Sequence, residues 1–141
     1  MVAAATTYVL DASAILRYLD GEAGAARVAD LIKSHLAGRA KIAVSAIHWG
    51  EVAGITFKFH GQLATDAVLA RLSRFSFEVV PATADRAVRG ALIKVKKKIP
   101  YADAFGVELA SDSRNHVLVT ADFDVKSAKS DVQIEFLPIK P

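Results

Sequence analysis

The chain has 141 residues, of which 52% are hydrophobic and 23% are charged, and its formal net charge is +3 at pH 7. This composition is typical of a folded domain with a sizeable core and excludes an intrinsically disordered chain. The sequence has no cysteine, which excludes disulfides, thiolate nucleophiles and zinc sites built on sulfur.

The length predicts a single domain over residues 1–141. No apolar run approaches the ~18 residues that a membrane-spanning helix needs. Residues 1–7 lack the basic flank and the long apolar region of a secretory signal. We therefore expect a cytoplasmic protein with no membrane partner. The modest net charge permits a nucleic-acid partner without demonstrating one, because nucleic-acid binding depends on where the positive charges lie on the surface.

Short apolar runs with β-type residues alternate with segments of helical periodicity. In chain order the sequence predicts a strand at 8–10, helices at 14–19 and 26–36, a strand at 41–44, helices at 45–58 and 67–75, a strand at 77–80, helices at 83–95 and 101–114, and strands at 116–119 and 132–136. Ser45 and Thr83 are predicted N-caps, Gly61 a break and Asn115 a C-cap. Strands separated by helices need crossover connections, which indicates an α/β fold with a mostly parallel sheet and helices on both sides.

Four acidic residues lie near the carboxyl ends of predicted strands or on the helices beside them. They are Asp11, Glu51, Asp103 and Asp122. Each has an ordinary structural explanation, as an N-cap, a solvated helix position, a partner of the helix dipole or a turn residue. Gathered at one edge of the sheet, however, they would repel one another and their pKa values would rise. A divalent cation would offset this charge, and oxygen ligands favour Mg²⁺ or Mn²⁺.

On these residues the sequence resembles the PIN domain family and, within it, the VapC-type toxin ribonucleases. The matching segments are Val9-Leu10-Asp11-Ala12-Ser13-Ala14, Val44-Ser45 with Glu51 six residues later, Asp103 followed by Ala110, and Val119-Thr120-Ala121-Asp122-Phe123-Asp124. The resemblance covers about residues 7–136. The separate motifs are short and common, and their ordered set carries the resemblance.

The resemblance implies a PIN-like three-layer α/β/α sandwich with a mostly parallel sheet of about five strands. It implies an endoribonuclease that hydrolyses RNA phosphodiester bonds with Mg²⁺ or Mn²⁺ as cofactor. The catalytic residues would be Asp11, Glu51, Asp103 and Asp122. Asp11, Asp103 and Asp122 would hold the metal, and Glu51 would complete the site or orient the attacking water.

The resemblance also implies supporting residues and protein partners. Ser13 and Thr120 match the hydroxyl residues that brace the family's acidic site, and Asp124 matches a less constant fifth acid. Val125 departs from the usual pattern, because an aromatic residue is common there, and His48-Trp49-Gly50 is an unusual stretch before Glu51. The implied partners are a second copy in a homodimer and a small antitoxin of a type II toxin–antitoxin pair, which inserts an amphipathic segment across the active site.

Basic residues gather on and after the fifth predicted helix. They are Arg86, Arg89, Lys94, Lys96, Lys97 and Lys98. Lys96, Lys97 and Lys98 are candidate contacts for the RNA backbone, although a solvated helix face explains them equally well. Trp49, Phe57 and Phe59 are predicted to pack in the core, with a groove for a partner as the alternative.

Two other functions stay open at this level. One is a PIN-domain nuclease of RNA processing or decay that has no antitoxin. The other is a non-catalytic α/β binding module in which the acids are structural caps. Mn²⁺ binding separates the binding module from the nucleases, because caps need no cation. A receiver-like phosphoacceptor domain is disfavoured, because no lysine follows the last predicted strand before Lys140.

Overall fold

A computed structural model of the chain, which describes residues 5–140, contains one sheet of five parallel strands. The strands are β1 (Thr7–Leu10), β2 (Lys41–Ser45), β3 (Glu78–Val80), β4 (His116–Thr120) and β5 (Gln133–Phe136). The predicted α/β fold with a parallel sheet is therefore confirmed. Residues 1–4 and 141 lie outside the described residues. The ends of the predicted domain and most of the amino-terminal segment expected to lack a secretory signal are therefore not described.

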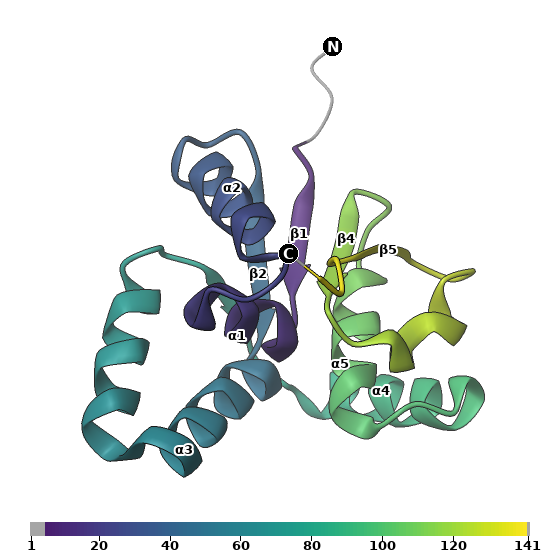
Figure 1. The fold of residues 1–141 in the computed structure, drawn as a ribbon. Coiled ribbons are helices and arrows are strands. Elements are labelled where there is room, and N and C mark those ends of the chain that lie inside the picture. The colour runs from purple at the N-terminus through teal and green to yellow at the C-terminus, as the bar shows by residue number, and fades with distance from the viewer. Residues whose placement is uncertain (1–4, 141) are drawn as a thin grey trace.

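The strand order is β3-β2-β1-β4-β5, with β1 at the centre (Figure 1). The chain first builds the sheet from β1 to β3 in one direction and then returns to add β4 and β5 on the other side of β1. Because crossover connections are right-handed, this reversal places the two sets of helices on opposite faces. One face is covered by α1 (Ala12–Asp20), α2 (Ala25–Leu36) and α3 (Ala46–Ser73), and the other by α4 (Ala84–Lys97), α5 (Tyr101–Ala110) and the short 3₁₀ helix η1 (Phe123–Ala128).

Two apolar clusters hold these layers together. Side chains alternate across a strand, so Leu10 packs into the cluster under α1, α2 and α3, while its neighbour Val9 packs into the cluster under α5. Both residues are completely buried. Strands buried on both faces explain why the predicted strands are continuous apolar runs. Within residues 5–140, no helix combines the length and apolar character that crossing a bilayer would require.

The predicted boundaries hold at Ser45 and Thr83, whose side chains cap α3 and α4. At Gly61 the backbone leaves the helical region, with φ 84° and ψ −175°, so the third and fourth predicted helices are two arms of α3 joined at a sharp bend. This conformation is essentially restricted to glycine. The predicted helix over 101–114 is too long, because α5 ends at Ala110. Ser111 is its C-cap in place of Asn115, and the Ser111 hydroxyl donates to the Glu108 carbonyl.

Candidate active site

A pocket of about 170 Å³ lies at the carboxyl edge of the sheet, where the strand order changes direction between β1 and β4. Open α/β sheets bind ligands at such points. The pocket is lined by Asp11, Ala12, Ser13, Leu16, His48, Glu51, Ile55, Asp103 and Asp122. The structure thus brings the four predicted acids together, although they are spread over more than a hundred positions of the sequence. Their catalytic role stays a prediction.

Size alone does not locate this pocket. A larger cavity of about 600 Å³ lies at the opposite edge of the sheet, beside the amino ends of β4 and β5, where it is lined by Arg114, His116 and Gln133 among others. None of the predicted acids lines it. The chemical character of the lining, and not the volume, therefore identifies the candidate site.

Asp11 is held at the end of β1 by three hydrogen bonds. Its Oδ1 accepts from the Ala14 amide at 3.0 Å and from the Ser13 hydroxyl at 2.6 Å, and its Oδ2 accepts from the Thr120 hydroxyl at 2.5 Å. The Asp122 amide donates to the Thr120 oxygen at 2.9 Å. Asp11 is therefore the N-cap of α1 and, at the same time, the side chain that joins β1 to the end of β4 in the pocket.

Asp103, in the first turn of α5, carries a strongly perturbed carboxyl group. Burial raises the pKa of Asp103 most, and the adjoining carboxyl group of Asp122 and the charges of Asp11 and Glu51 add to the effect, so that the pKa reaches about 7. The Oδ2 atom of Asp103 is buried and accepts no hydrogen bond from any of residues 5–140. A buried carboxylate oxygen normally has a donor or a cation beside it, because leaving it unpartnered is costly.

Three of the acids can offer oxygens to one cation. One oxygen each from Asp103, Asp122 and Asp124 lies within 4.8 Å of the others. Asp122 Oδ1 also accepts from the Asp124 backbone amide at 2.9 Å, which fixes the Asp122 carboxyl group at the start of η1. The oxygen-only donor set and the unpartnered Asp103 oxygen fit a hard divalent cation such as Mg²⁺ or Mn²⁺. Asp124 thus lies beside Asp103 and Asp122, two of the predicted metal ligands, although the resemblance matches it only to a less constant fifth acid.

Glu51 lies one helical turn after His48 on α3, and its side chain is 38% exposed at the pocket. His48 is 1% exposed, and its Nε2 atom lies 2.8 Å from the Ala102 carbonyl, next to Asp103. Because a carbonyl only accepts, Nε2 must be the donor. His48 thus ties the helix that carries Glu51 to the helix that carries Asp103. Apart from the occurrence of His48 in the unusual stretch before Glu51, no pattern in the sequence predicts this position.

Three of the six basic residues on and after α4 form ion pairs with acids. Arg86 and Arg89 both pair with the buried Glu108, although Arg89 stays 53% exposed, and Lys97 forms an ion pair with Asp131 at 2.6 Å. Lys96 and Lys98 are exposed. Contact of Lys96, Lys97 and Lys98 with RNA stays a prediction, and Lys97 would have to exchange Asp131 for a phosphate group to make it.

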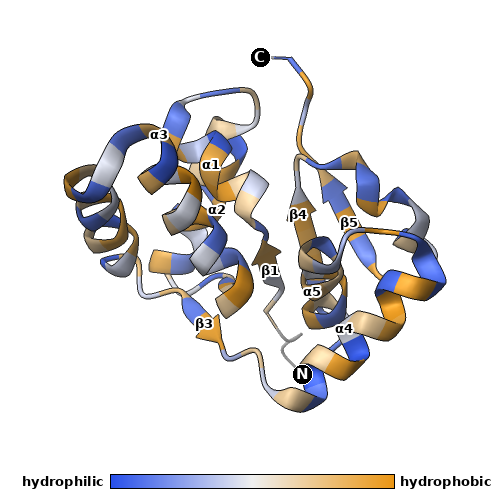
Figure 2. Ribbon diagram, turned by 90° about the horizontal axis from the view of Figure 1, so that it is seen from below, coloured by the Kyte–Doolittle hydropathy of each residue, from blue (hydrophilic) through white to orange (hydrophobic). Residues whose placement is uncertain are grey.

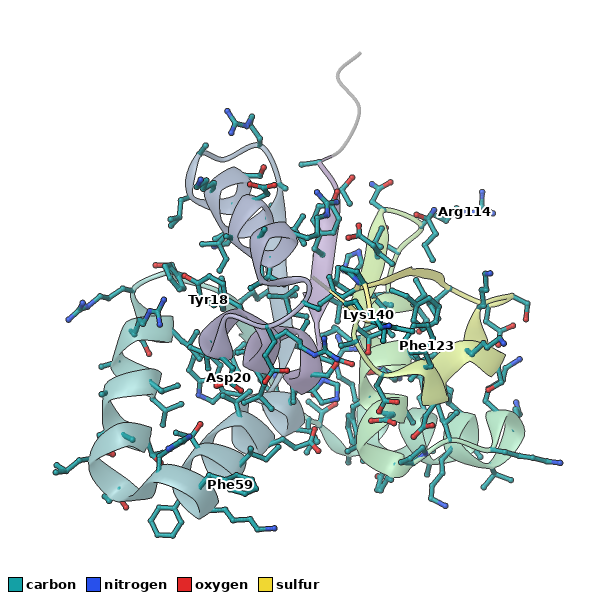
Figure 3. The ribbon with its side chains drawn as sticks, viewed as in Figure 1. Tyr18, Asp20, Phe59, Arg114, Phe123 and Lys140 are labelled. Atoms are coloured by element: carbon teal, nitrogen blue, oxygen red, sulfur yellow. The ribbon has the colours of Figure 1, made fainter. Side chains whose placement is uncertain are left out.

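Two of the three aromatic residues on α3 do not pack in the core. Phe57 is 55% exposed and Phe59 67% exposed, so the predicted core packing is wrong for both, while Trp49 packs against the core cluster as predicted. Phe59 lines a groove of about 460 Å³ between α1 and the two arms of α3. Figure 3 shows Phe59 on the lower arm of α3, with Asp20 of α1 above it. The bend at Gly61 holds this groove open by keeping the second arm from continuing the first.

Solved structures with this fold include toxin–antitoxin proteins. The chain resembles VapBC2 from Rickettsia felis, solved bound to a DNA fragment from its promoter, with a TM-score of 0.71, 17% identity and coverage of 94% of this chain and 99% of that one. It resembles PAE2754 from Pyrobaculum aerophilum (TM-score 0.65, 23% identity, 94% and 91% coverage). It also resembles VapC20 from Mycobacterium tuberculosis, described as a Sarcin–Ricin loop cleaving toxin (TM-score 0.62, 19% identity, 93% and 99% coverage).

These similarities concern the fold, because every identity is below 25%. A search of curated proteins finds no match. The family model of the PIN domain matches residues 8–130, a span that runs from β1 through η1 and includes all five acids of the pocket region. The match covers most of the sequence, in agreement with the resemblance seen in its motifs. The chain belongs to the PIN domain family.

Proposed function

We propose that this chain is a Mg²⁺- or Mn²⁺-dependent endoribonuclease and the toxin of a VapBC-type toxin–antitoxin pair. The observation that carries the proposal is the buried, unpartnered oxygen of Asp103 among three further carboxylates, at the switch point of a PIN fold. PIN domains are generally nucleases. RNA is proposed as the substrate from the family resemblance, and the fold of a toxin described as cleaving the Sarcin–Ricin loop supports it.

We assign different roles in phosphodiester hydrolysis to the residues of the pocket. Asp103 and Asp122 would hold the metal together with Asp11 or Asp124. A bound divalent cation would supply charge to the phosphoryl oxygens and acidify a bound water. Glu51, which is partly exposed, can accept a proton from an attacking water and orient it. Ser13 and Thr120 hold Asp11 in one rotamer.

The direct test is cleavage of a structured RNA by the purified protein. We expect cleavage with Mn²⁺ or Mg²⁺ and none with excess EDTA, restored when metal is added back. Calorimetry with Mn²⁺ alone provides an independent readout, because a binding module whose acids are caps would take up no cation. Absence of both Mn²⁺ binding and cleavage would overturn the proposal.

Because the pKa of Asp103 is raised, we expect Mn²⁺ binding to depend on pH. A carboxylate must lose its proton before it can bind a metal, so Mn²⁺ binding should release a proton wherever Asp103 is protonated. Below pH 7 the dissociation constant for Mn²⁺ should rise by up to about tenfold per pH unit. Calorimetry between about pH 5.5 and pH 8 measures this slope.

The Asp103→Asn variant serves as the control for this slope, because it has no carboxyl group to titrate at that position. Whatever weak Mn²⁺ binding it keeps should vary much less with pH. A wild-type dissociation constant that stays flat between about pH 5.5 and pH 7 would contradict the assignment of Asp103 as a ligand.

We propose that the antitoxin occupies the groove between α1 and α3. The groove is lined mainly by apolar side chains, including Leu16, Ile55 and Phe59, and has Asp20 and Arg71 among its polar residues. Leu16 and Ile55 also line the acidic pocket. An amphipathic segment in the groove would therefore continue over the acids and block access of RNA to them.

Replacing Phe59 by aspartate should weaken binding of the antitoxin by roughly 30-fold or more, because a buried aromatic anchor typically contributes at least about 2 kcal/mol to an interface. The probe is the protein encoded by a small reading frame adjacent to this one, titrated in calorimetry. Leu36→Asp is the matched control, since Leu36 is 58% exposed on α2 and does not line the groove. Equal affinities for the two variants would place the antitoxin elsewhere.

If no adjacent reading frame encodes such a protein, while Mn²⁺-dependent cleavage is present, the chain is a PIN nuclease of RNA processing or decay.

A further inference from the structure

Phe123 is an aromatic residue held in place at the surface beside the acidic pocket. It directly follows Asp122, begins η1 and is 45% exposed. Its ring stacks on the ring of Phe136, with the two centroids 4.9 Å apart and the two planes 4° apart. Phe136 in turn packs against the cluster under α5. Phe123 is thus a fixed aromatic surface that the core does not cover.

The exposure of Phe123 follows from the geometry of η1. Residues three positions apart lie on the same side of a 3₁₀ helix, and Val125 and Ala128 form the buried side of this one. Val125 is 1% exposed and stands where an aromatic residue is common in the PIN family. Phe123, two positions earlier, lies off the buried side. The core therefore holds the smaller valine and leaves the larger ring outside, so this ring requires another explanation than packing.

A second pocket, of about 370 Å³, opens beside this ring, between α1 and the start of η1. In Figure 2, α1 lies on one side of β4 and β5 lies on the other, so the carboxyl end of β4 separates the two walls of the pocket. Ser13, Leu16 and Asp122 belong to both this pocket and the acidic pocket, which makes the two neighbours. The full lining consists of Ser13, Leu16, Arg17, Asp20, Glu22, Ala121, Asp122 and Phe123.

The charges of the second pocket favour a nucleobase over a phosphate group. In the described part of the chain, Arg17 is the one basic residue that lines it, beside the acids Asp20, Glu22 and Asp122. Carboxylates repel phosphate, but they accept hydrogen bonds from the N–H groups of a base. An exposed aromatic ring such as that of Phe123 stacks on the flat face of a base. The lining therefore suits a planar ligand that carries N–H donors.

Arg17 and Glu22 lie next to each other in this lining. Arg17 Nη1 donates to the Ala23 carbonyl at 3.2 Å, which positions the guanidinium and leaves other N–H donors for a ligand. Arg17 Nε lies 3.8 Å from Glu22 Oε2, which is too long for a hydrogen bond. A donor beside a carboxylate matches the edge of guanine, where the O6 acceptor adjoins the N1–H and N2 amino donors. Adenine and cytosine present the reverse order, and uracil has a single donor.

We propose that this pocket binds an unpaired guanine next to the phosphate that is cut. The base would stack on Phe123, its O6 would accept from Arg17, and its N1–H and N2 amino groups would donate to Glu22. The substrate class is then RNA cleaved beside a guanine outside a double helix, because a paired base exposes neither its face nor this edge. The assignment to RNA rests on the proposed nuclease function, whereas binding of the base needs no metal.

Nucleoside binding in excess EDTA tests the pocket without metal or cleavage. In titrations followed by NMR, guanosine should bind at least about fivefold more tightly than adenosine, cytidine or uridine. Phe123→Ala should weaken guanosine binding by at least about fivefold, the lower end for loss of one base–aromatic contact, and Phe123→Trp should retain it. Phe57→Ala is the control and should bind like the wild type, since Phe57 is 55% exposed on α3 and does not line the pocket.

Glu22→Gln tests the choice of base. A carboxamide has one acceptor oxygen, so it cannot accept from both guanine donors in the way a carboxylate does. The preference for guanosine over adenosine should fall by at least about fivefold, while adenosine binding stays unchanged because the stacking contact remains. The side chain of Glu22 is 58% exposed, so the substitution should not disturb the fold. Equal losses for the two nucleosides would overturn the role of Glu22 in reading guanine.

Cleavage of a single-stranded RNA that contains one guanine links the pocket to the substrate. The wild type should cut beside this guanine, and Phe123→Ala should lower kcat/KM there by at least about fivefold. Guanosine binding without any cleavage would support the base pocket and overturn the nuclease function. Cleavage by a wild type that binds no guanosine at millimolar concentration, or that binds the four nucleosides equally, would overturn the base pocket alone. A Phe123→Ala variant that loses affinity only for the antitoxin would also overturn it.

Discussion

Replacing Asp103 by asparagine should lower the rate of metal-dependent RNA cleavage by at least about 100-fold. Removing a residue that only supports a metal ligand already lowers activity by about 10- to 100-fold, and loss of a ligand itself should cost at least as much. Asparagine keeps the size of the side chain and one of its oxygens but removes the negative charge. The pocket would keep its shape and lose the carboxylate whose buried oxygen has no partner. We expect Asp11→Asn to have a comparable effect on activity.

The same substitution should stabilise the protein without metal. Asp103 has a pKa raised to about 7, so the folded chain binds its proton more tightly than the unfolded chain does. Stability of the metal-free protein is therefore lost as the pH rises from about 4 through 7. Asp103→Asn removes this loss, and its melting temperature in EDTA at about pH 8 should exceed that of the wild type.

Opposite changes in activity and stability distinguish a site residue from a structural one. Cleavage assays and thermal unfolding in EDTA measure the two effects. Asp30→Asn, which changes an exposed acid on α2, should alter neither. Wild-type activity in Asp103→Asn would refute the site assignment, and a large fall in its stability would indicate a structural carboxylate.

Replacing Glu108 by alanine should destabilise the fold by about 3 kcal/mol, in the range found when one member of a buried ion pair is removed. Glu108 is 1% exposed and accepts from both Arg86 and Arg89, while Arg86 also donates to Asp112 at 2.7 and 3.0 Å. The change would leave Arg86 with Asp112 as its remaining partner and open a gap between α4 and α5. Urea unfolding measures the difference.

The control for this prediction is the exposed pair of Arg27 and Glu135. Arg27 donates to both oxygens of Glu135, at 2.8 and 2.9 Å, but the two side chains are 42% and 31% exposed. Glu135→Ala should therefore cost less than about 1 kcal/mol. Equal losses for Glu108→Ala and Glu135→Ala would show that burial adds nothing to the network between α4 and α5.

The strands and the acids were predictable because each depends on local information. A buried parallel strand is an apolar run, and an acid directly after it lies at the carboxyl edge of the sheet. Asp11 and Asp122 satisfy this rule and line one pocket. The five parallel strands and the break at Gly61 follow from the same kind of pattern.

Contacts between distant residues were not predictable. The amphipathic pattern of α4 indicates an apolar face without showing which side meets the protein, and the partners of Arg86 and Arg89 on α5 decide it. His48 is buried against Ala102, 54 positions away, and no spacing rule connects them. Phe59 is exposed in the groove that the bend at Gly61 leaves between the two arms of α3, and a rule that buries aromatic residues takes no account of such a bend.

The pairing of β1 with β4 has a consequence for synthesis on the ribosome. β1 is made first, but one of its two neighbours in the sheet begins only at His116, and Thr7 pairs with that residue. The hydroxyl that holds Asp11 belongs to Thr120, and Asp122 follows it. A nascent or prematurely terminated chain that stops before residue 116 therefore has no complete pocket, so the proposed nuclease activity could begin only after the ribosome has released β4 and Asp122.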